Sequence, residues 1–238
     1  MSDFALWHRS VTPAALGLSE ESFPAAPPLG RLVDPPAGPV DVDSGDPMVE
    51  ISHRRISTVN AYWGAGWTTA CRGTWVRRGV ASRLSAIADM LPADWGLHVF
   101  DGWRPLALQE ELYQAAYHDP SLPPGFLSPP DHDPATPPPH LSGGTVDLTL
   151  SYKGVPLALG TPFDAFWDLA TTTALDDTPG PDRAGRRWLV HLMRAEGFIV
   201  LHCEWWHFEF GTRRWAAITG QPAQYRAIHG VERPGGSR

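Results

Sequence analysis

Three side chains, His140, Asp147 and His207, have the types and spacing of a metal site. Histidine and aspartate are ordinary zinc ligands, and three protein ligands leave a fourth coordination position for water. Bound zinc lowers the pKa of that water to about 7, so hydroxide becomes available at neutral pH. Gly143 and Gly144 would let the chain turn between the first two ligands. The three residues therefore predict one Zn²⁺ site per chain.

Each of these residues also has a plainer explanation when it is taken singly. His140 follows a proline-rich loop and could lie on the surface, and Asp147 could face water from a strand. His207 stands between two aromatic residues and could be a hydrogen-bonded core histidine. The residues alone leave these alternatives open, although the three together favour a metal site.

Glu204 is the candidate general base, which would take a proton from the attacking water and pass it to a leaving amine. Residues three apart on a regular strand face opposite sides, so Glu204 and His207 would diverge. We therefore predict a bulge or bend between Glu204 and Trp206, because bulges are common beside active sites. Glu209, on the same face as His207, is the rival carboxylate and could instead support a ligand histidine.

Arg104 stands in a turn, DGWRP at residues 101–105, which follows a short apolar run. Strand-end turns are good positions for functional side chains. A fixed guanidinium here could stabilise the oxyanion that forms when hydroxide attacks a carbonyl. A surface salt bridge is the alternative.

Residues 198–210, FIVLHCEWWHFEF, are the stretch around which the chain is organised. They are rich in aromatic and β-branched residues without Gly or Pro, which predicts one strand. Ionisable groups are costly in a buried strand unless they are paired or bind a metal. We interpret this strand as the floor of an active site.

The remaining elements follow from hydrophobic periodicity and turn residues. Helices are predicted over 80–91, 106–117 and 183–196, strands over 50–58, 96–100 and 145–150, a hairpin over 152–157, and a helix start at 161–164. Their order predicts an α+β fold, with a small, mainly antiparallel sheet, flanking helices and the zinc site on the sheet.

Composition narrows the function classes. The formal net charge of −7 and the lack of a basic run argue against nucleic acid. Two cysteines, Cys71 and Cys203, make neither a disulfide framework nor a four-cysteine zinc cluster. No apolar stretch approaches a transmembrane helix and no signal pattern opens the chain, so we expect a cytoplasmic protein with no membrane partner. The oligomeric state is left open.

Three blocks of the sequence resemble the VanX-type D-alanyl-D-alanine dipeptidases, zinc enzymes of the LAS (lysostaphin, D-Ala-D-Ala metallopeptidase, sonic hedgehog) group. These blocks are DGWRP at 101–105, HLSGGTVD at 140–147 and EWWH at 204–207. The resemblance implies that His140, Asp147 and His207 bind zinc. It also implies that Glu204 is the base and that Arg104 stabilises the oxyanion.

A fourth block, GTPFD at 160–164, resembles the segment whose aspartate contacts the substrate's free amino group in that family. The resemblance gives this role to Asp164, while a helix-capping role is the alternative. Pro138 replaces a serine that the family places near the bound dipeptide, Thr145 replaces alanine and Trp103 replaces tyrosine. These departures concern the substrate and leave the zinc chemistry alone.

We expect a zinc-dependent dipeptidase that acts on D-Ala-D-Ala-like dipeptides, with a small peptide as its partner. The alternatives are a D,D-carboxypeptidase for longer peptidoglycan peptides, a zinc-holding binding module without turnover, and a scaffold without metal. The expected organisation is a proline-rich N-terminal arm over 1–48, a zinc peptidase domain over 49–220 and a loose tail over 221–238. Residues 119–139, with nine prolines, predict a lid or rim loop.

Overall fold

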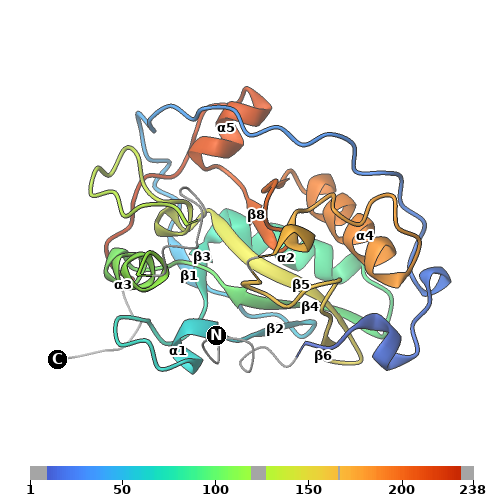
Figure 1. Ribbon diagram of the computed structural model, residues 1–238. Coiled ribbons are helices and arrows are strands. Elements are labelled where there is room, and N and C mark those ends of the chain that lie inside the picture. Colours follow the sequence, from blue (N-terminus) through green and yellow to red (C-terminus); the bar gives the residue numbers. More distant parts are fainter. Residues whose placement is uncertain (1–9, 119–126, 166, 232–238) are drawn as a thin grey trace.

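A central mixed sheet organises the molecule, as the computed structural model shows for residues 10–118, 127–165 and 167–231. Its strands follow the order β2-β4-β5-β8-β7, with β6 paired to β5 (Figure 1). The strands are β1 Met48–Glu50, β2 Ile56–Thr58, β3 Trp75–Arg77, β4 Trp95–Asp101, β5 Thr145–Tyr152, β6 Val155–Pro156, β7 Ile199–Val200 and β8 His207–Glu209. Only β2 and β4 pair in parallel within this sheet; β1 and β3 form a separate antiparallel pair. The α+β prediction is confirmed.

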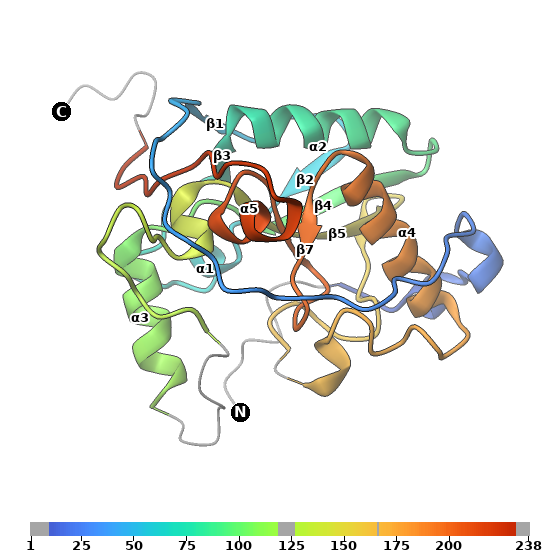
Figure 2. The same ribbon diagram turned by 90° about the horizontal axis from the view of Figure 1, so that it is seen from above.

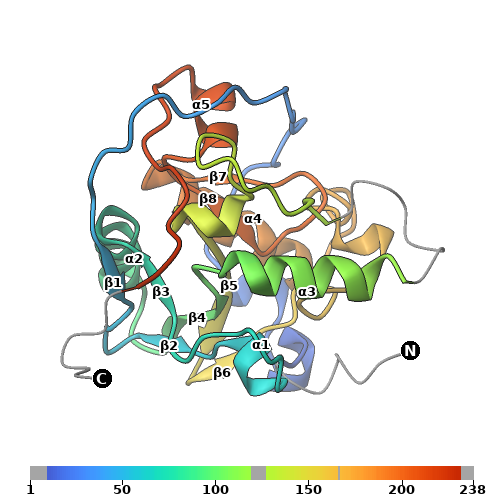
Figure 3. The same cartoon turned by 90° about the vertical axis from the view of Figure 1, so that its left-hand side faces the viewer.

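Helices flank the sheet and supply much of the core. They are α1 Ala61–Gly64, α2 Arg78–Met90, α3 Leu106–Ala116, α4 Pro181–Ala195 and α5 Arg213–Thr219, with 3₁₀ helices η2 Pro13–Leu16, η3 Glu20–Ser22, η4 Pro139–Ser142 and η5 Asp168–Ala170. The apolar positions of α2 and α4 recur at three- and four-residue spacing and are buried, as in an amphipathic helix. Figure 2 shows α2 along one side of the strands and the segment after β6 on the opposite side. Figure 3 shows α3 at the front of that view, crossing near the middle of the molecule.

Strand β5 lies in the middle of the sheet and is buried on both faces. Val146, Leu148 and Leu150 are fully buried in the hydrophobic core. Thr145 and Asp147 point to the other face and are also buried. A carboxylate on such a strand must be paired or bind a cation. Asp147 on β5 is therefore a candidate functional residue.

Residues 198–210 form a hairpin, so the prediction of a single strand is wrong. The chain reverses between β7 and β8, and the amide of Leu201 donates to the carbonyl of His207 at 3.0 Å. The indoles of Trp205 and Trp206 are both buried. Residues 205 and 206 form a turn outside both strands, and the amide of His207 donates to the carbonyl of Glu204 at 3.4 Å. The bend predicted at 204–206 is confirmed.

Two other predicted elements differ from the structure. Residues 50–58 contain parts of two strands, β1 and β2, because the chain turns at Arg54 and Arg55. No helix begins at 161–164, since Asp164 has a left-handed backbone with φ of 55°. A left-handed residue cannot sit in the first turn of a helix, so the capping role considered for Asp164 does not apply.

The segment before the predicted domain packs on the fold over residues 10–47. The ring of Phe23 lies 5.1 Å from that of Trp95, and Val40 is completely buried. Asp43 pairs with Arg77 at 2.7 Å. The blue segment in Figures 1 and 2 passes over α5 and along α4. Residues 10–47 of the expected proline-rich arm therefore pack against the rest of the fold, whereas residues 1–9 lie outside the described chain.

Residues 221–231 are also bound to the fold, so the expectation of a loose tail is wrong for them. Tyr225 is 2% exposed, and its hydroxyl donates to Asp46 at 3.1 Å. The indole of Trp103 donates to the carbonyl of Ile228 at 2.9 Å. Within the described ranges, no helix is long and apolar enough to cross a membrane. The division into domains stays a prediction.

Candidate metal centre and active site

The sheet register places three ionisable side chains in one row. Asp147 on β5 is directly opposite Asp101 on β4 and His207 on β8. Directly opposite residues of antiparallel strands project to the same face, with Cβ atoms about 4.5–5.5 Å apart. Residues far apart in the sequence therefore meet because of strand pairing.

The 3₁₀ helix η4 brings His140 to the same row. It leads into β5 through Gly143, whose φ of 72° closes the helix in the left-handed region that favours glycine. Gly144 follows where a Cβ would stand 2.6 Å from the carbonyl oxygen of Phe210. The two glycines thus permit the tight turn that the sequence predicted between the first and second ligands.

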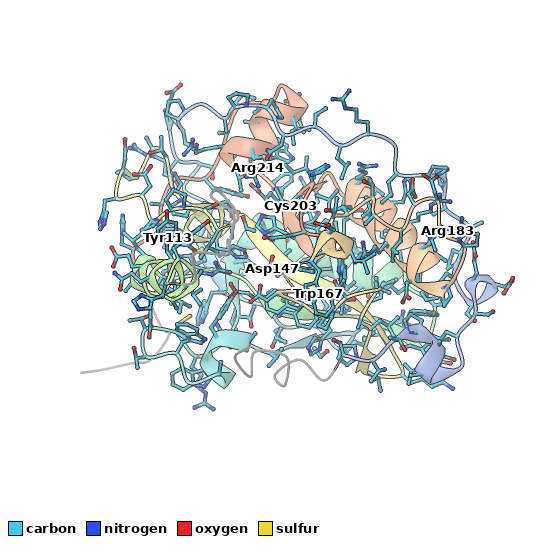
Figure 4. The ribbon with its side chains drawn as sticks, viewed as in Figure 1. Tyr113, Asp147, Trp167, Arg183, Cys203 and Arg214 are labelled. Atoms are coloured by element: carbon cyan, nitrogen blue, oxygen red, sulfur yellow. The ribbon has the colours of Figure 1, made fainter. Side chains whose placement is uncertain are left out.

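His140, Asp147 and His207 form one compact buried cluster. Candidate ligand atoms of the three residues all lie within 4.8 Å of one another. Nε2 of His140 is 3.3 Å from Oδ2 of Asp147, and Nδ1 of His207 is 3.1 Å from Oδ1 of Asp147. Figure 4 shows Asp147 near the centre of the molecule, and Cys203 and Arg214 above it.

The second nitrogen of each histidine has its own acceptor. Nδ1 of His140 is 2.7 Å from the carbonyl oxygen of Gly102, which can only accept, so Nδ1 carries the proton. Nε2 of His207 is 3.1 Å from Oε1 of Glu209. These contacts leave Nε2 of His140 and Nδ1 of His207 as lone-pair donors toward Asp147, the arrangement typical of metal-ligating histidines.

The donor set fits a divalent cation. Oδ1 of Asp147 is buried and accepts no hydrogen bond of acceptable geometry. Burial opposes ionisation of Asp147, whereas positive charge and hydrogen bonds from protonated His140 and His207 would lower its pKa. A divalent cation held by the neutral imidazoles would supply that positive charge in their place. An ionised buried carboxylate with an unsatisfied oxygen beside two imidazole lone pairs is suited to a metal ion.

Glu204 lies beside this cluster, at the turn between β7 and β8. Its Oε2 is 3.5 Å from Nδ1 of His207, and its side chain is 16% exposed. Burial raises the pKa of Glu204, although the charge of His207 opposes the shift. A raised carboxyl pKa brings a general base nearer to neutral pH, where it can both accept and release a proton.

Arg104 is buried in a network that fixes its guanidinium. Nε donates to Asp101 at 3.0 Å, Nη1 to Gln109 at 2.9 Å and Nη2 to the hydroxyl of Tyr62 at 3.2 Å. Nη2 also lies 3.9 Å from Oδ2 of Asp147. The surface salt bridge considered from the sequence is therefore ruled out for Arg104, which is 4% exposed.

Asp164 reaches the same network through Tyr62. The hydroxyl of Tyr62 donates to Oδ2 of Asp164 at 2.9 Å while accepting from Arg104. Burial, followed by the charge of Asp147, raises the pKa of Asp164 to about 8. This carboxyl therefore sits where a nearby cation would favour its ionised form.

Comparison with known proteins decides the family. The family model described as D-Ala-D-Ala dipeptidase matches residues 75–222, more than half of the chain. This chain belongs to the D-Ala-D-Ala dipeptidase family. It is therefore a metallopeptidase by family, and the cluster of His140, Asp147 and His207 is its candidate metal centre.

Two relatives of the D-Ala-D-Ala dipeptidase family carry the same name. A D-alanyl-D-alanine dipeptidase of Synechocystis is 28% identical over 212 residues, which cover 73% of this chain and 85% of the relative. A D-alanyl-D-alanine dipeptidase of Streptomyces coelicolor is 39% identical over 71 residues, 29% of this chain and 35% of the relative. A solved structure, a mutant of the vancomycin resistance D,D-pentapeptidase VanY with Zn(II), has a TM-score of 0.38 at 16% identity. It covers 66% of this chain and 84% of that one.

Three residues around the dipeptidase family's motifs were missed by sequence reasoning. Tyr62 lies in a stretch with no clear periodicity, and Gln109 lies on the helix face that the periodicity assigned to packing. Asp101 stood in the DGWRP block without a role. What marks these three residues is that their polar groups are buried beside that block. Burial is known only from the structure, so the sequence held no usable signal for them.

Proposed function

We propose that the chain is a zinc-dependent dipeptidase that hydrolyses D-Ala-D-Ala-like dipeptides. One observation carries the proposal: a partly buried carboxylate, Glu204, and a buried guanidinium, Arg104, lie against the same ligand cluster. A module that only held zinc would need neither group. Membership of the D-Ala-D-Ala dipeptidase family supports the choice of substrate.

His140, Asp147 and His207 would hold the zinc ion. Two imidazole nitrogens and one carboxylate oxygen are a usual catalytic zinc set, which leaves a coordination position open. Bound zinc would supply Lewis acidity, polarising the scissile carbonyl and lowering the pKa of a coordinated water. Gly102 and Glu209 would keep the two imidazoles in the tautomers that ligation requires.

Glu204 is assigned the proton transfers. Its carboxylate, next to His207, would accept the proton of the attacking water and then protonate the leaving amine of the second residue. The low solvent exposure of its side chain supports this role. Electrostatic interactions are stronger away from bulk water, so the gain or loss of one proton has a larger effect there. The turn between β7 and β8 sets its direction.

Arg104 is assigned the oxyanion. Asp101, Gln109 and Tyr62 hold the guanidinium in place before any substrate arrives. A preorganised donor of this kind stabilises charge that develops in the transition state without reorganising. Nη2, the nitrogen closest to Asp147, is the atom that faces the candidate metal centre.

Asp164 is assigned the free amino group of the substrate. A substrate ammonium would supply the positive charge that this buried carboxyl lacks, and Tyr62 holds the carboxyl in position. This pairing would restrict the enzyme to substrates with an unblocked amino terminus. It is the feature that separates a dipeptidase from a D,D-carboxypeptidase.

The test supplies zinc-loaded, folded protein with D-Ala-D-Ala, N-acetyl-D-Ala-D-Ala and L-Ala-L-Ala, and measures alanine release. We expect rapid cleavage of the first and little of the other two. Asp164→Asn should remove the preference for the free amine, because an amide cannot pair with ammonium as a carboxylate does. Cleavage of the acetylated peptide as well as the free one would favour the carboxypeptidase alternative. No release from any peptide would overturn the enzymatic proposal.

A further inference from the structure

A chain of charged contacts links the N-terminal arm to the metal ligand His207. Oδ1 of Asp34, on the arm, is 2.9 Å from Nε of Arg214 on α5. Nη1 of Arg214 donates to Oε1 of Glu209 at 2.8 Å. The same Oε1 lies 3.1 Å from Nε2 of His207. Four residues from two distant parts of the sequence, the arm and residues 207–214, therefore form one continuous series.

Glu209 is the central member of this series and is almost completely enclosed. Its side chain is 1% exposed, and its second oxygen accepts from the hydroxyl of Thr212. A buried carboxylate requires a compensating charge, and removal of the partner of a buried ion pair is strongly destabilising. Arg214 is the cation that contacts it. Without Arg214, the oxygen that accepts from His207 would lose the 2.8 Å contact that fixes its position.

We propose that Arg214 is a positioning residue for the metal ligand His207, and that the arm takes part through Asp34. The guanidinium holds the Glu209 carboxylate, which orients the imidazole so that Nδ1 faces the centre. This inference deepens the proposed function and rests on its zinc ion.

Arg213 provides a matched control on the same helix. It donates to the carbonyls of Ala37 and Gly38 at 3.1 and 2.9 Å, so it ties the same stretch of the arm to α5. None of its described hydrogen bonds reaches Glu209. Loss of Arg213 therefore tests only the attachment of the arm. Loss of Arg214 removes an attachment of the arm and also the positive charge that contacts Glu209.

An adjoining cavity makes a chemical rescue possible. A cavity of about 510 Å³ has Asp34, Glu209 and Arg214 among its lining residues. Truncation in Arg214→Ala would extend this space and admit a free guanidinium ion from solvent. Guanidinium carries the charge and the planar donor geometry of the lost side chain. Urea has nearly the same shape without the charge and is the matched control compound.

The experiment measures the zinc dissociation constant of the full chain by competition with a chromophoric chelator. Arg214→Ala should weaken zinc binding about 10–100-fold, the usual cost of losing a partner of a metal ligand. Asp34→Asn should weaken it less, because its side chain is 46% exposed. Arg213→Ala should leave it unchanged. Millimolar guanidinium, at non-denaturing concentrations, should restore affinity to Arg214→Ala, and urea should not.

Cobalt(II) absorption provides a second readout that general destabilisation would not move. Substituted Co²⁺ should show a changed ligand-field spectrum in Arg214→Ala and an unchanged one in Arg213→Ala. If Arg214→Ala does not fold, Asp34→Asn and Arg214→Gln decide the matter by the same two measurements.

The outcomes separate this inference from the proposed function. Failure of the unsubstituted protein to bind zinc would overturn both. Normal zinc binding by the unsubstituted protein, with equal affinities in Arg214→Ala and Arg213→Ala, would overturn the positioning role alone. Rescue by urea as strong as rescue by guanidinium would overturn the role assigned to the charge.

Discussion

Glu204 shows how much of the chemistry depends on single side chains. Its carboxylate contacts the candidate ligand His207. Glu204 is not itself one of the three residues of the candidate metal cluster. In the proposed mechanism, the two roles of holding the metal and moving protons would therefore be carried by different residues. Substitution of one should separate them.

Glu204→Gln should lower kcat on D-Ala-D-Ala by about 10²–10⁴-fold while zinc content stays at one per chain, because general acid–base catalysis contributes that range. The amide keeps the shape of the side chain but accepts no proton. The measurement pairs steady-state kinetics with metal analysis. His202→Gln, an exposed position in the same turn, is the control. Loss of zinc from Glu204→Gln would instead make Glu204 a ligand.

At the scale of elements, the pairing of β5 with β8 assembles part of the candidate metal centre. The register that sets Asp147 opposite His207 also sets Thr145 opposite Glu209. Gly144 lies at the entry to this pairing, where its missing side chain lets the strands approach. A shift of the β5–β8 register by one residue would turn Asp147 to the other face of the sheet. The glycine at 144 therefore helps to maintain the register that the candidate metal site requires.

Gly144→Ala should destabilise the fold by about 1–3 kcal/mol, the typical cost of overpacking. The added Cβ would meet the backbone oxygen of Phe210 at 2.6 Å, and a backbone atom cannot rotate away. Denaturant unfolding measures the change. Gly38→Ala is the control, because a Cβ there meets nothing within 4 Å. Equal stabilities of the two variants would show that the strand entry is looser than the structure indicates.

At the scale of the whole molecule, segments from both ends of the chain close around the sheet. The arm contacts α4 and α5, and Arg77 binds both the arm's Asp43 and the carbonyl of Arg226. The candidate metal ligands come from η4, β5 and β8 and lie in this enclosed core. Metal binding should therefore stabilise the folded chain as a unit.

Removal of zinc by a chelator should lower the melting temperature. A ligand at 100 times its dissociation constant stabilises the native state by about 2.7 kcal/mol. For a chain of this size, that corresponds to a shift of about 5–10 °C. Differential scanning calorimetry measures it. His140→Ala, which lacks a ligand, should show almost no shift, and a zinc-independent melting temperature in the unsubstituted protein would contradict the metal centre.

The sequence by itself predicted the candidate ligand cluster, and it determined the alternation of β5, the helices α2, α3 and α4, and the bend near Glu204. These features follow from the spacing of residue types along the sequence, which is a local property of the chain. Only the tertiary structure decided that residues 198–210 form a hairpin, that Asp164 adopts a left-handed backbone held by Tyr62, and that Asp34 reaches Glu209 through Arg214. The physical reason is that strand register, burial and ion pairing join residues far apart in the chain, and local periodicity carries no record of such partners.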